Sequence, residues 1–198
     1  MSLPVASFAA LRPQTLSSPS SGPTRLRVPD LLHATDQAAD DVLSGRCDQL
    51  LPPGGVPESQ RWFTRIHGDE ELDIWLISWV YGHPTELHDH GGSLGALTVV
   101  SGSLNEFRWD GRGLRRRRLD AGDQAGFPLG WVHDVVRAPR PVTGSTAGPA
   151  STGREPEQPT LSVHAYSPPL TAMSYYELTP RNTLRRQRTE LTDQPEGP

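Results

Sequence analysis

Hydrophobic positions from residue 72 onward either alternate with polar ones or form short apolar runs. LDIWLISWV (72–80) is mostly apolar, which predicts a largely buried strand. LGALTVVSG and SLNEFRW meet at Gly102, which predicts a hairpin over residues 94–109. Further strand candidates are LRRRRL (114–119), WVHDVV (131–136), TLSVHAYS (160–167) and TAMSYYEL (171–178). Many short strands with turn residues between them predict an all-β sandwich or barrel.

The chain before this region has a helical pattern. Apolar side chains recur at helical spacing at Leu31, Leu32, Ala38 and Val42. A helix is therefore expected from Pro29 to Gly45, and a short second helix from Pro57 into Phe63. Residues 1–28 are rich in Ser, Pro and Ala without sustained periodicity, so we expect a flexible N-terminal tail.

Length and composition indicate one domain with long loops. The 198 residues can bury a core, but only 34% are hydrophobic, while 19 are Gly and 20 are Pro. We expect a single domain over residues 29–190 and a C-terminal tail over residues 191–198. Residues 138–159 are rich in proline and lack periodicity, which predicts a disordered insertion between two strands. We interpret it as a surface insertion, with a lid over the site as the alternative.

Charge and cysteine content exclude several classes of protein. The net charge of −4 argues against nucleic-acid binding, and LRRRRL is interpreted as a solvated edge strand. No apolar stretch is long enough to span a membrane. The single cysteine, Cys47, excludes an internal disulfide framework and suits a reducing compartment. No basic segment precedes VASFAAL, so no signal peptide is expected, and we expect a cytoplasmic monomer.

Two glycine-punctuated stretches carry the candidate chemistry. In GHPTELHDHGGSLGALTVVSG (82–102), His88 and His90 are two positions apart, so on an extended segment their rings point to the same face. GDQAGFPLGWVHDVVR (122–137) contains His133. Imidazole ligands suit iron, zinc, copper or nickel. GGSLG (91–95) also fits the G-x-S-x-G pattern of hydrolases, but the β-branched run after it replaces the required helix.

Together the two stretches resemble the paired motifs of the cupin superfamily. The resemblance implies a small antiparallel β-barrel, or jelly roll, with short N-terminal helices, in which His88, His90 and His133 bind one metal ion. Many cupins add a glutamate ligand at the position of Gly95. Three neutral imidazoles leave the full charge on the ion, which favours an anionic ligand such as a thiolate. Three open positions on one face suit iron(II), Fe(2+), holding substrate and dioxygen.

Four segments narrow the resemblance to the bacterial form of type I cysteine dioxygenase, in the thiol dioxygenase family. They are FTR (63–65), HDH (88–90), GWVHDV (130–135) and SVHAYSPP (162–169). The resemblance implies a non-haem iron(II) enzyme that oxidises L-cysteine with O2 to cysteine sulfinate. It also implies that Arg65 holds the substrate carboxylate, for which the planar guanidinium fork is suited.

Ser162, His164 and Tyr166 alternate, so they share one face of a strand. If that face is the barrel interior, Ser162 orients His164, His164 bonds to the hydroxyl of Tyr166, and Tyr166 stabilises bound dioxygen or the substrate carboxylate. The alternative is a buried hydrogen-bond network of structural value only. An inward polar line is costly unless it is satisfied, which favours the functional interpretation.

The chain departs from the animal enzymes at two positions. Gly95 occupies the position of a cysteine that is crosslinked to the active-site tyrosine in animals, so no thioether is expected. Phe63 stands where the animal pattern has tyrosine, so one hydroxyl near the substrate carboxylate is missing.

Two alternative functions remain open. One is a dioxygenase for 3-mercaptopropionate or another small thiol, which would use the same three histidines. That branch typically has glutamine at the position of Arg65, so Arg65 favours cysteine. The other is a cupin that binds a metal or a small molecule without catalysis, and SVHAYSPP argues against it.

Overall fold

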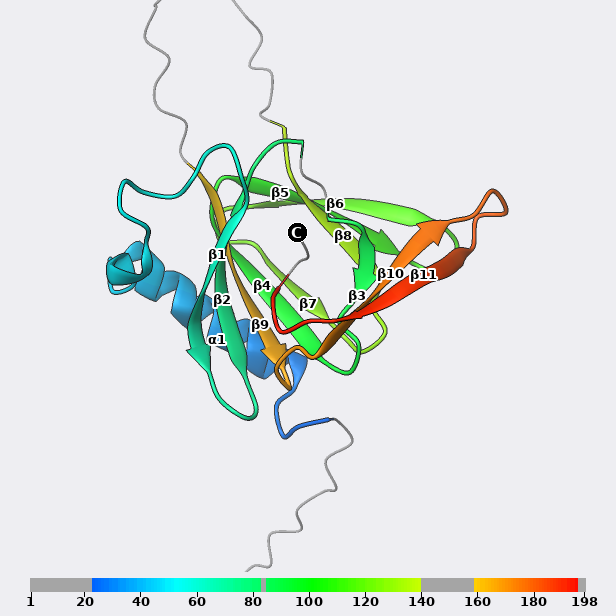
Figure 1. Ribbon diagram of the computed structural model, residues 1–198, viewed down its shortest axis with the longest axis horizontal. Coiled ribbons are helices and arrows are strands. Elements are labelled where there is room, and N and C mark those ends of the chain that lie inside the picture. The colour runs from blue at the N-terminus through cyan, green and yellow to red at the C-terminus, as the bar shows by residue number, and fades with distance from the viewer. Residues whose placement is uncertain (1–22, 83–84, 140–158, 196–198) are drawn as a thin grey trace, which may run out of the picture.

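The structure, a computed structural model, describes residues 23–82, 85–139 and 159–195 (Figure 1). Most of the expected N-terminal tail and of the expected insertion, residues 1–22 and 140–158, therefore lies outside the described residues. No helix in the described part of the chain has the length and apolar character needed to cross a membrane.

The described residues form one α-helix, one 3-10 turn and a series of strands. The helix α1 spans Val28–Leu43 and the turn spans Asp48–Leu50. The first strands are β1 (Trp62–Gly68), β2 (Asp73–Trp79), β3 (Leu87–Asp89), β4 (Leu94–Ser101), β5 (Ser103–Trp109) and β6 (Leu114–Asp120). The remaining strands are β7 (Gln124–Phe127), β8 (His133–Arg137), β9 (Thr160–Ser167), β10 (Ala172–Leu178) and β11 (Leu184–Leu191).

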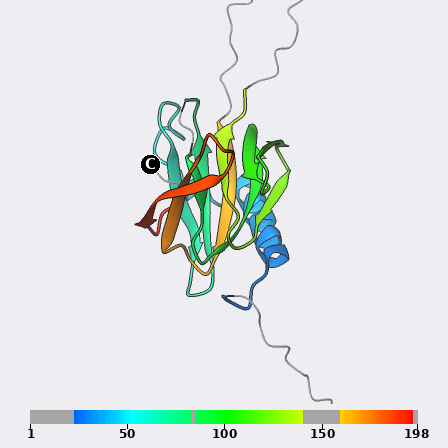
Figure 2. The ribbon, with the colours of Figure 1, turned by 90° about the vertical axis from the view of Figure 1, so that its right-hand side faces the viewer.

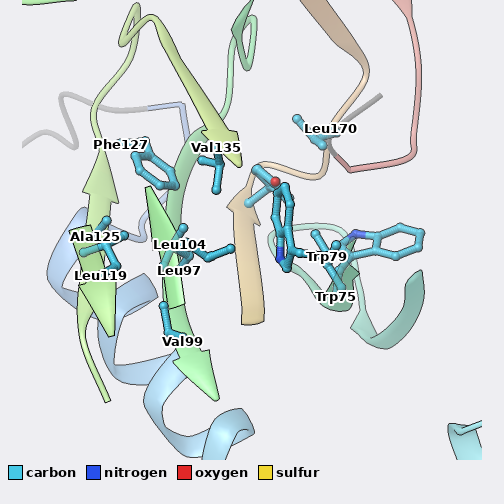
Figure 3. Close-up of a cluster of buried hydrophobic side chains, with 12 residues drawn as sticks. Trp75, Trp79, Leu97, Val99, Leu104, Leu119, Ala125, Phe127, Val135 and Leu170 are labelled. Carbon is cyan, nitrogen blue, oxygen red and sulfur yellow. The ribbon is translucent and has the colours of Figure 1, made fainter. Parts of the chain in front are cut away.

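The strands form two antiparallel sheets that face each other (Figure 1). The order of the first sheet is β1-β2-β9-β4-β7, and that of the second is β11-β10-β3-β8-β5-β6. A cluster of buried side chains from both sheets fills the space between them, including Trp75, Trp79, Leu97, Leu104, Phe127 and Val135 (Figure 3). The all-β prediction is confirmed, and the two facing antiparallel sheets agree with the β-barrel that the resemblance implied.

The helix α1 covers the outer side of the first sheet. It contacts β4, β9 and β7, and Figure 2 shows it alongside these strands. Leu31 and Ala38 of the helix pack with Leu76 and Val163 in a second buried cluster. Because the sheet is covered on both faces, its central strands are buried on both faces, and all seven residues of β2 are buried.

The expected hairpin over residues 94–109 is wrong, although both strands exist. The strands β4 and β5 lie in different sheets, so the turn between them is a corner of the barrel. Gly102 at this corner has a φ of +71°, and a Cβ there would lie 2.2 Å from Oγ1 of Thr160. Only glycine combines this backbone conformation with so close an approach.

The expected second helix is also wrong, because Trp62 and Phe63 begin strand β1. Phe63 packs against the cluster between the sheets, whereas Trp62 packs against the cluster under α1. Neighbouring residues of a strand point to opposite faces, so the strand lets both rings contact a buried cluster. A 3-10 turn at Asp48–Leu50 follows α1 instead, and it comes before the segment in which the second helix was expected.

Candidate metal centre

Two neighbouring strands of the second sheet carry the three predicted histidines. His88 lies in β3, His90 follows that strand directly, and His133 begins β8. The two strands are antiparallel, and His88 is the direct cross-strand partner of His133. The residues of such a pair project from the same face of the sheet. The pairing of β3 with β8 therefore brings together histidines that are far apart in the sequence.

The three imidazole rings converge inside the barrel. One ring nitrogen from each lies within 4.8 Å of the others, and Nε2 of His90 is 3.5 Å from Nε2 of His133. The side chains of His88 and His133 are fully buried, and His90 is 4% exposed. Three buried imidazoles that present nitrogen atoms to one point form a donor set that can hold a transition metal.

A backbone hydrogen bond determines which nitrogen of His88 is the ligand. Its Nδ1 lies 2.7 Å from the carbonyl oxygen of Glu86. A carbonyl oxygen only accepts, so Nδ1 carries the proton and donates it. The lone pair of the neutral ring is then on Nε2, the atom that can bind a metal.

Glu106 lies beside His133 and was missed by the sequence analysis. Its carboxylate is 3% exposed, and Oε1 lies 3.5 Å from Nδ1 of His133. Oε1 also accepts from Nε1 of Trp131 at 3.4 Å, and Oε2 accepts from Nη2 of Arg117 at 3.1 Å. Burial would raise the pKa of Glu106, but the interactions with His133, Arg117 and Trp131 outweigh it and lower this pKa below its ordinary value. Leu104 and Glu106 share a face of β5, so a charge on a core-facing position was the available signal.

Asp89, between the two histidines of HDH, accepts hydrogen bonds that link β3 to β10 and to the turn after β3. Its Oδ2 accepts a hydrogen bond of 2.6 Å from the hydroxyl of Tyr176 on β10, and its Oδ1 accepts from the backbone N–H of Gly91 at 2.9 Å. Burial, the hydrogen bond and the charge of Asp89 raise the pKa of Tyr176 to about 12. No local pattern in the sequence indicated that Tyr176 is the partner of Asp89.

The predicted polar line runs along the inner face of β9. His164 Nε2 lies 2.9 Å from Oγ of Ser162, and His164 Nδ1 lies 3.2 Å from the hydroxyl of Tyr166. All three side chains are fully buried. Trp79, which the sequence analysis did not include, donates from Nε1 to Oγ of Ser162 at 2.8 Å. Because the Tyr166 and His90 ring centroids are 4.9 Å apart, the line ends beside the histidine cluster.

Arg65 lies on β1, at the side of the first sheet. Its Nε is 3.5 Å from Oδ1 of the buried Asp73, and its Nη2 donates to the carbonyl of Asp193 at 3.5 Å. Its guanidinium lies over the ring of Trp75, 4.5 Å from the centroid. Burial raises the pKa of Asp73, although the charge of Arg65 acts in the opposite direction. The strand register makes Trp75 the neighbour of both Arg65 and His164, so these residues form one row across three strands.

Gly95 leaves space next to the histidines. A Cβ at this position would lie 2.9 Å from Cδ2 of Phe127 and 3.3 Å from Nδ1 of His90. Any side chain at residue 95 would therefore press on a ring of the cluster. Among the described residues, the group that can hold a metal here consists of three histidines and contains no carboxylate ligand.

The family model described as "Cysteine dioxygenase type I" matches residues 57–127, which contain Arg65, His88 and His90. Over this segment the chain is similar to the cysteine dioxygenase type I family. The matched segment ends before His133, which the structure places as the cross-strand partner of His88.

Solved structures similar to this chain include a protein with a double-stranded beta-helix domain from Klebsiella pneumoniae (18% identity, 61% of this chain, 85% of that chain, TM-score 0.42). Another is KdgF from Halomonas sp. (18% identity, 57% and 84%, TM-score 0.42). A third is a cupin superfamily protein from Desulfitobacterium hafniense (12% identity, 57% and 81%, TM-score 0.40). No curated protein matches the chain at a significant level.

Proposed function

We propose that this protein is a non-haem iron(II) dioxygenase that oxidises L-cysteine to cysteine sulfinate. The thiol and one O2 supply all the atoms of the sulfinic acid, because both oxygen atoms are added to sulfur. The observation that most supports this proposal is the buried cluster of His88, His90 and His133, with Tyr166 beside His90.

The three histidines would hold iron(II) through neutral imidazoles. When bound, the ion supplies the place where the thiolate and dioxygen meet. The donor set adds no negative charge, so an anionic sulfur is favoured as a further ligand. Gly95 keeps the neighbourhood of His90 open, since a side chain there would contact the ring of that histidine.

We assign the remaining roles to groups on the first sheet. Arg65 would bind the substrate carboxylate, since a guanidinium pairs with it through two parallel hydrogen bonds. The hydroxyl of Tyr166 would hydrogen-bond to the substrate or to dioxygen. His164 and Ser162 would hold Tyr166 in position, because the three side chains form one buried hydrogen-bonded line.

We further propose that residues 29–190 act as one cupin domain and that the protein works as a cytoplasmic monomer without nucleic-acid or membrane partners. A second candidate substrate is 3-mercaptopropionate, which also presents a thiol and a carboxylate. A cupin that only binds a metal or a small molecule is the third candidate. The buried Ser162–His164–Tyr166 line supports catalysis over binding alone.

The test is turnover of iron-loaded protein with a panel of thiols in air and under anaerobic conditions. We expect sulfinate from L-cysteine only in air, with both oxygen atoms labelled when 18O2 is used, detected by mass spectrometry. A His90→Ala variant serves as the control and should lose iron and activity. Faster oxidation of 3-mercaptopropionate would change the substrate, and no oxidation of any thiol would contradict the function.

A further inference from the structure

Trp75 has a buried indole N–H that needs an acceptor. The residue is 6% exposed, and within the described part of the chain its Nε1 makes no hydrogen bond of normal geometry. A buried donor without a partner is destabilising, so native structures rarely retain one without a reason. The other tryptophan of β2, Trp79, donates its N–H to Ser162.

The position of Trp75 connects this donor with the proposed substrate site. Trp75 faces the space between the two sheets, and it is the cross-strand neighbour of Arg65 on one side and His164 on the other. The guanidinium of Arg65 lies over its ring at 4.5 Å. The ring of Phe63 packs edge-on against it, with centroids 5.9 Å apart and an interplanar angle of 71°.

We propose that the Nε1–H of Trp75 is a second hydrogen-bond donor to the carboxylate of the thiol substrate, next to Arg65. The inference rests on the proposed function and makes Trp75 a specificity-determining residue for thiols that carry a carboxylate. Phe63 has no hydroxyl to offer, and its ring packs directly on Trp75. An indole N–H can only donate, so it recognises an anion and offers nothing to an ammonium group.

Asp73 is the competing acceptor, and its contacts define its role. Its carboxylate lies 3.5 Å from Nε of Arg65, and the N–H of Trp75 is close enough to favour the charged form of Asp73. With Asp73 at Nε and the carbonyl of Asp193 accepting from Nη2, the guanidinium still has N–H groups on its terminal nitrogens for a second anion. In our proposal Asp73 orients Arg65, and the substrate carboxylate takes the hydrogen bond of Trp75.

The first test is the kinetics of Trp75→Phe, which removes the N–H but keeps an aromatic ring under Arg65. We expect kcat/KM for L-cysteine to fall about tenfold or more, as for loss of a hydrogen bond to a charged group, mostly through KM. The value for cysteamine, which has no carboxylate, should not change. Trp109→Phe, at the end of β5, is the matched control for a lost indole. Equal losses with both thiols would overturn the proposal.

The second test observes the indole directly and needs no turnover. The chain contains five tryptophans, so 15N-tryptophan labelling of the full-length protein gives a simple indole spectrum. The Trp75 resonance is assigned from Trp75→Phe or, should that variant not fold, from its contacts with the Phe63 ring. With and without Zn2+, L-cysteine and 3-mercaptopropionate should shift this resonance, and cysteamine should not.

The two tests separate the inference from the proposed function. If no thiol is oxidised but carboxylate-bearing thiols still shift the Trp75 resonance, the function fails and the carboxylate subsite stands. If cysteine is oxidised but the resonance follows only the titration of Asp73, then Trp75 is a structural partner of Asp73. That result, or an unchanged kcat/KM in Trp75→Phe, would refute the inference.

Discussion

At the scale of single residues, the candidate site divides into groups that would bind a metal and groups that hold those ligands in place. His88, His90 and His133 present the nitrogens. The carbonyl of Glu86 fixes the tautomer of His88, and the carboxylate of Glu106 lies beside His133. Such supporting groups set ligand orientation and basicity, so their loss should weaken metal binding without removing a ligand.

Replacing Arg65 tests substrate recognition. In Arg65→Ala we expect kcat/KM for L-cysteine to fall roughly ten- to a hundred-fold, because a hydrogen bond to a charged group contributes about 1.5–3 kcal/mol. Cysteamine has no carboxylate, so its turnover should change little. Arg65→Lys should rescue only part of the loss, since a point charge cannot reproduce the fork. Similar losses for both thiols would show that Arg65 acts through structure.

Replacing Glu106 tests support of the metal ligand. Glu106→Gln keeps an acceptor for Trp131 but removes the charge beside His133. We expect the affinity for Fe(II), measured by competition with a chelator, to fall about 10- to 100-fold. The exposed Glu70→Gln should leave affinity unchanged. Unaltered metal affinity in Glu106→Gln would limit Glu106 to its pairing with Arg117.

At the scale of elements, β3 is the shortest of the described strands and depends most on its neighbours for its position. It spans only Leu87–Asp89, with His88 on one face and Asp89 on the other. Its position depends on the pairing with β8 and β10, and on the hydrogen bond from Tyr176 to Asp89. The metal site is therefore held by elements that come later in the chain.

Replacing Tyr176 tests this anchor. In Tyr176→Phe we expect a loss of about 1.5–3 kcal/mol in the free energy of unfolding, reduced by partial exposure, because a hydrogen bond to a carboxylate is removed. The folded-state pKa of Tyr176, about 12, lies above its ordinary value of 10.0. The stabilisation is thus complete below about pH 10 and is lost as pH rises toward 12. Urea titrations at pH 8 and pH 11 should show a smaller difference between variant and wild type at the higher pH.

Replacing Gly102 tests the corner between the two sheets. Gly102→Ala should lower the free energy of unfolding by clearly more than about 1 kcal/mol, since backbone strain adds to the clash with Thr160. Gly111 is the matched control, because it has a φ of +86° and nothing within 4 Å of an added Cβ. Gly111→Ala should lose only the backbone contribution. Equal losses in urea unfolding would refute the role of the close approach.

At the scale of the whole molecule, the candidate site exists only between the two sheets. The second sheet supplies the three histidines and Glu106, and the first supplies Tyr166 and its line, Trp75 and Arg65. The helix α1 covers the outer side of the first sheet and contributes no site residue. It packs on the apolar outer face of the central strands, whereas their inner face carries the polar row.

Local patterns in the sequence determined much of this protein. Apolar runs and turn residues indicated most strands and the all-β class, since side-chain period and burial are read from neighbouring residues. The spacing of His88 and His90, together with the segment around His133, indicated a metal site. The alternation of Ser162, His164 and Tyr166 indicated their shared face. Apart from the addition of His133 to the metal site, each of these inferences depends on residues a few positions apart.

The tertiary structure decided what depends on which strands pair. It placed β4 and β5 in different sheets, because the pattern of a strand does not name its partner. It made His133 the neighbour of His88, brought Glu106 to His133, and set Trp75 between Arg65 and His164. These contacts join segments that are far apart in the chain. They arise from sheet register and the packing of two sheets, which no local pattern encodes.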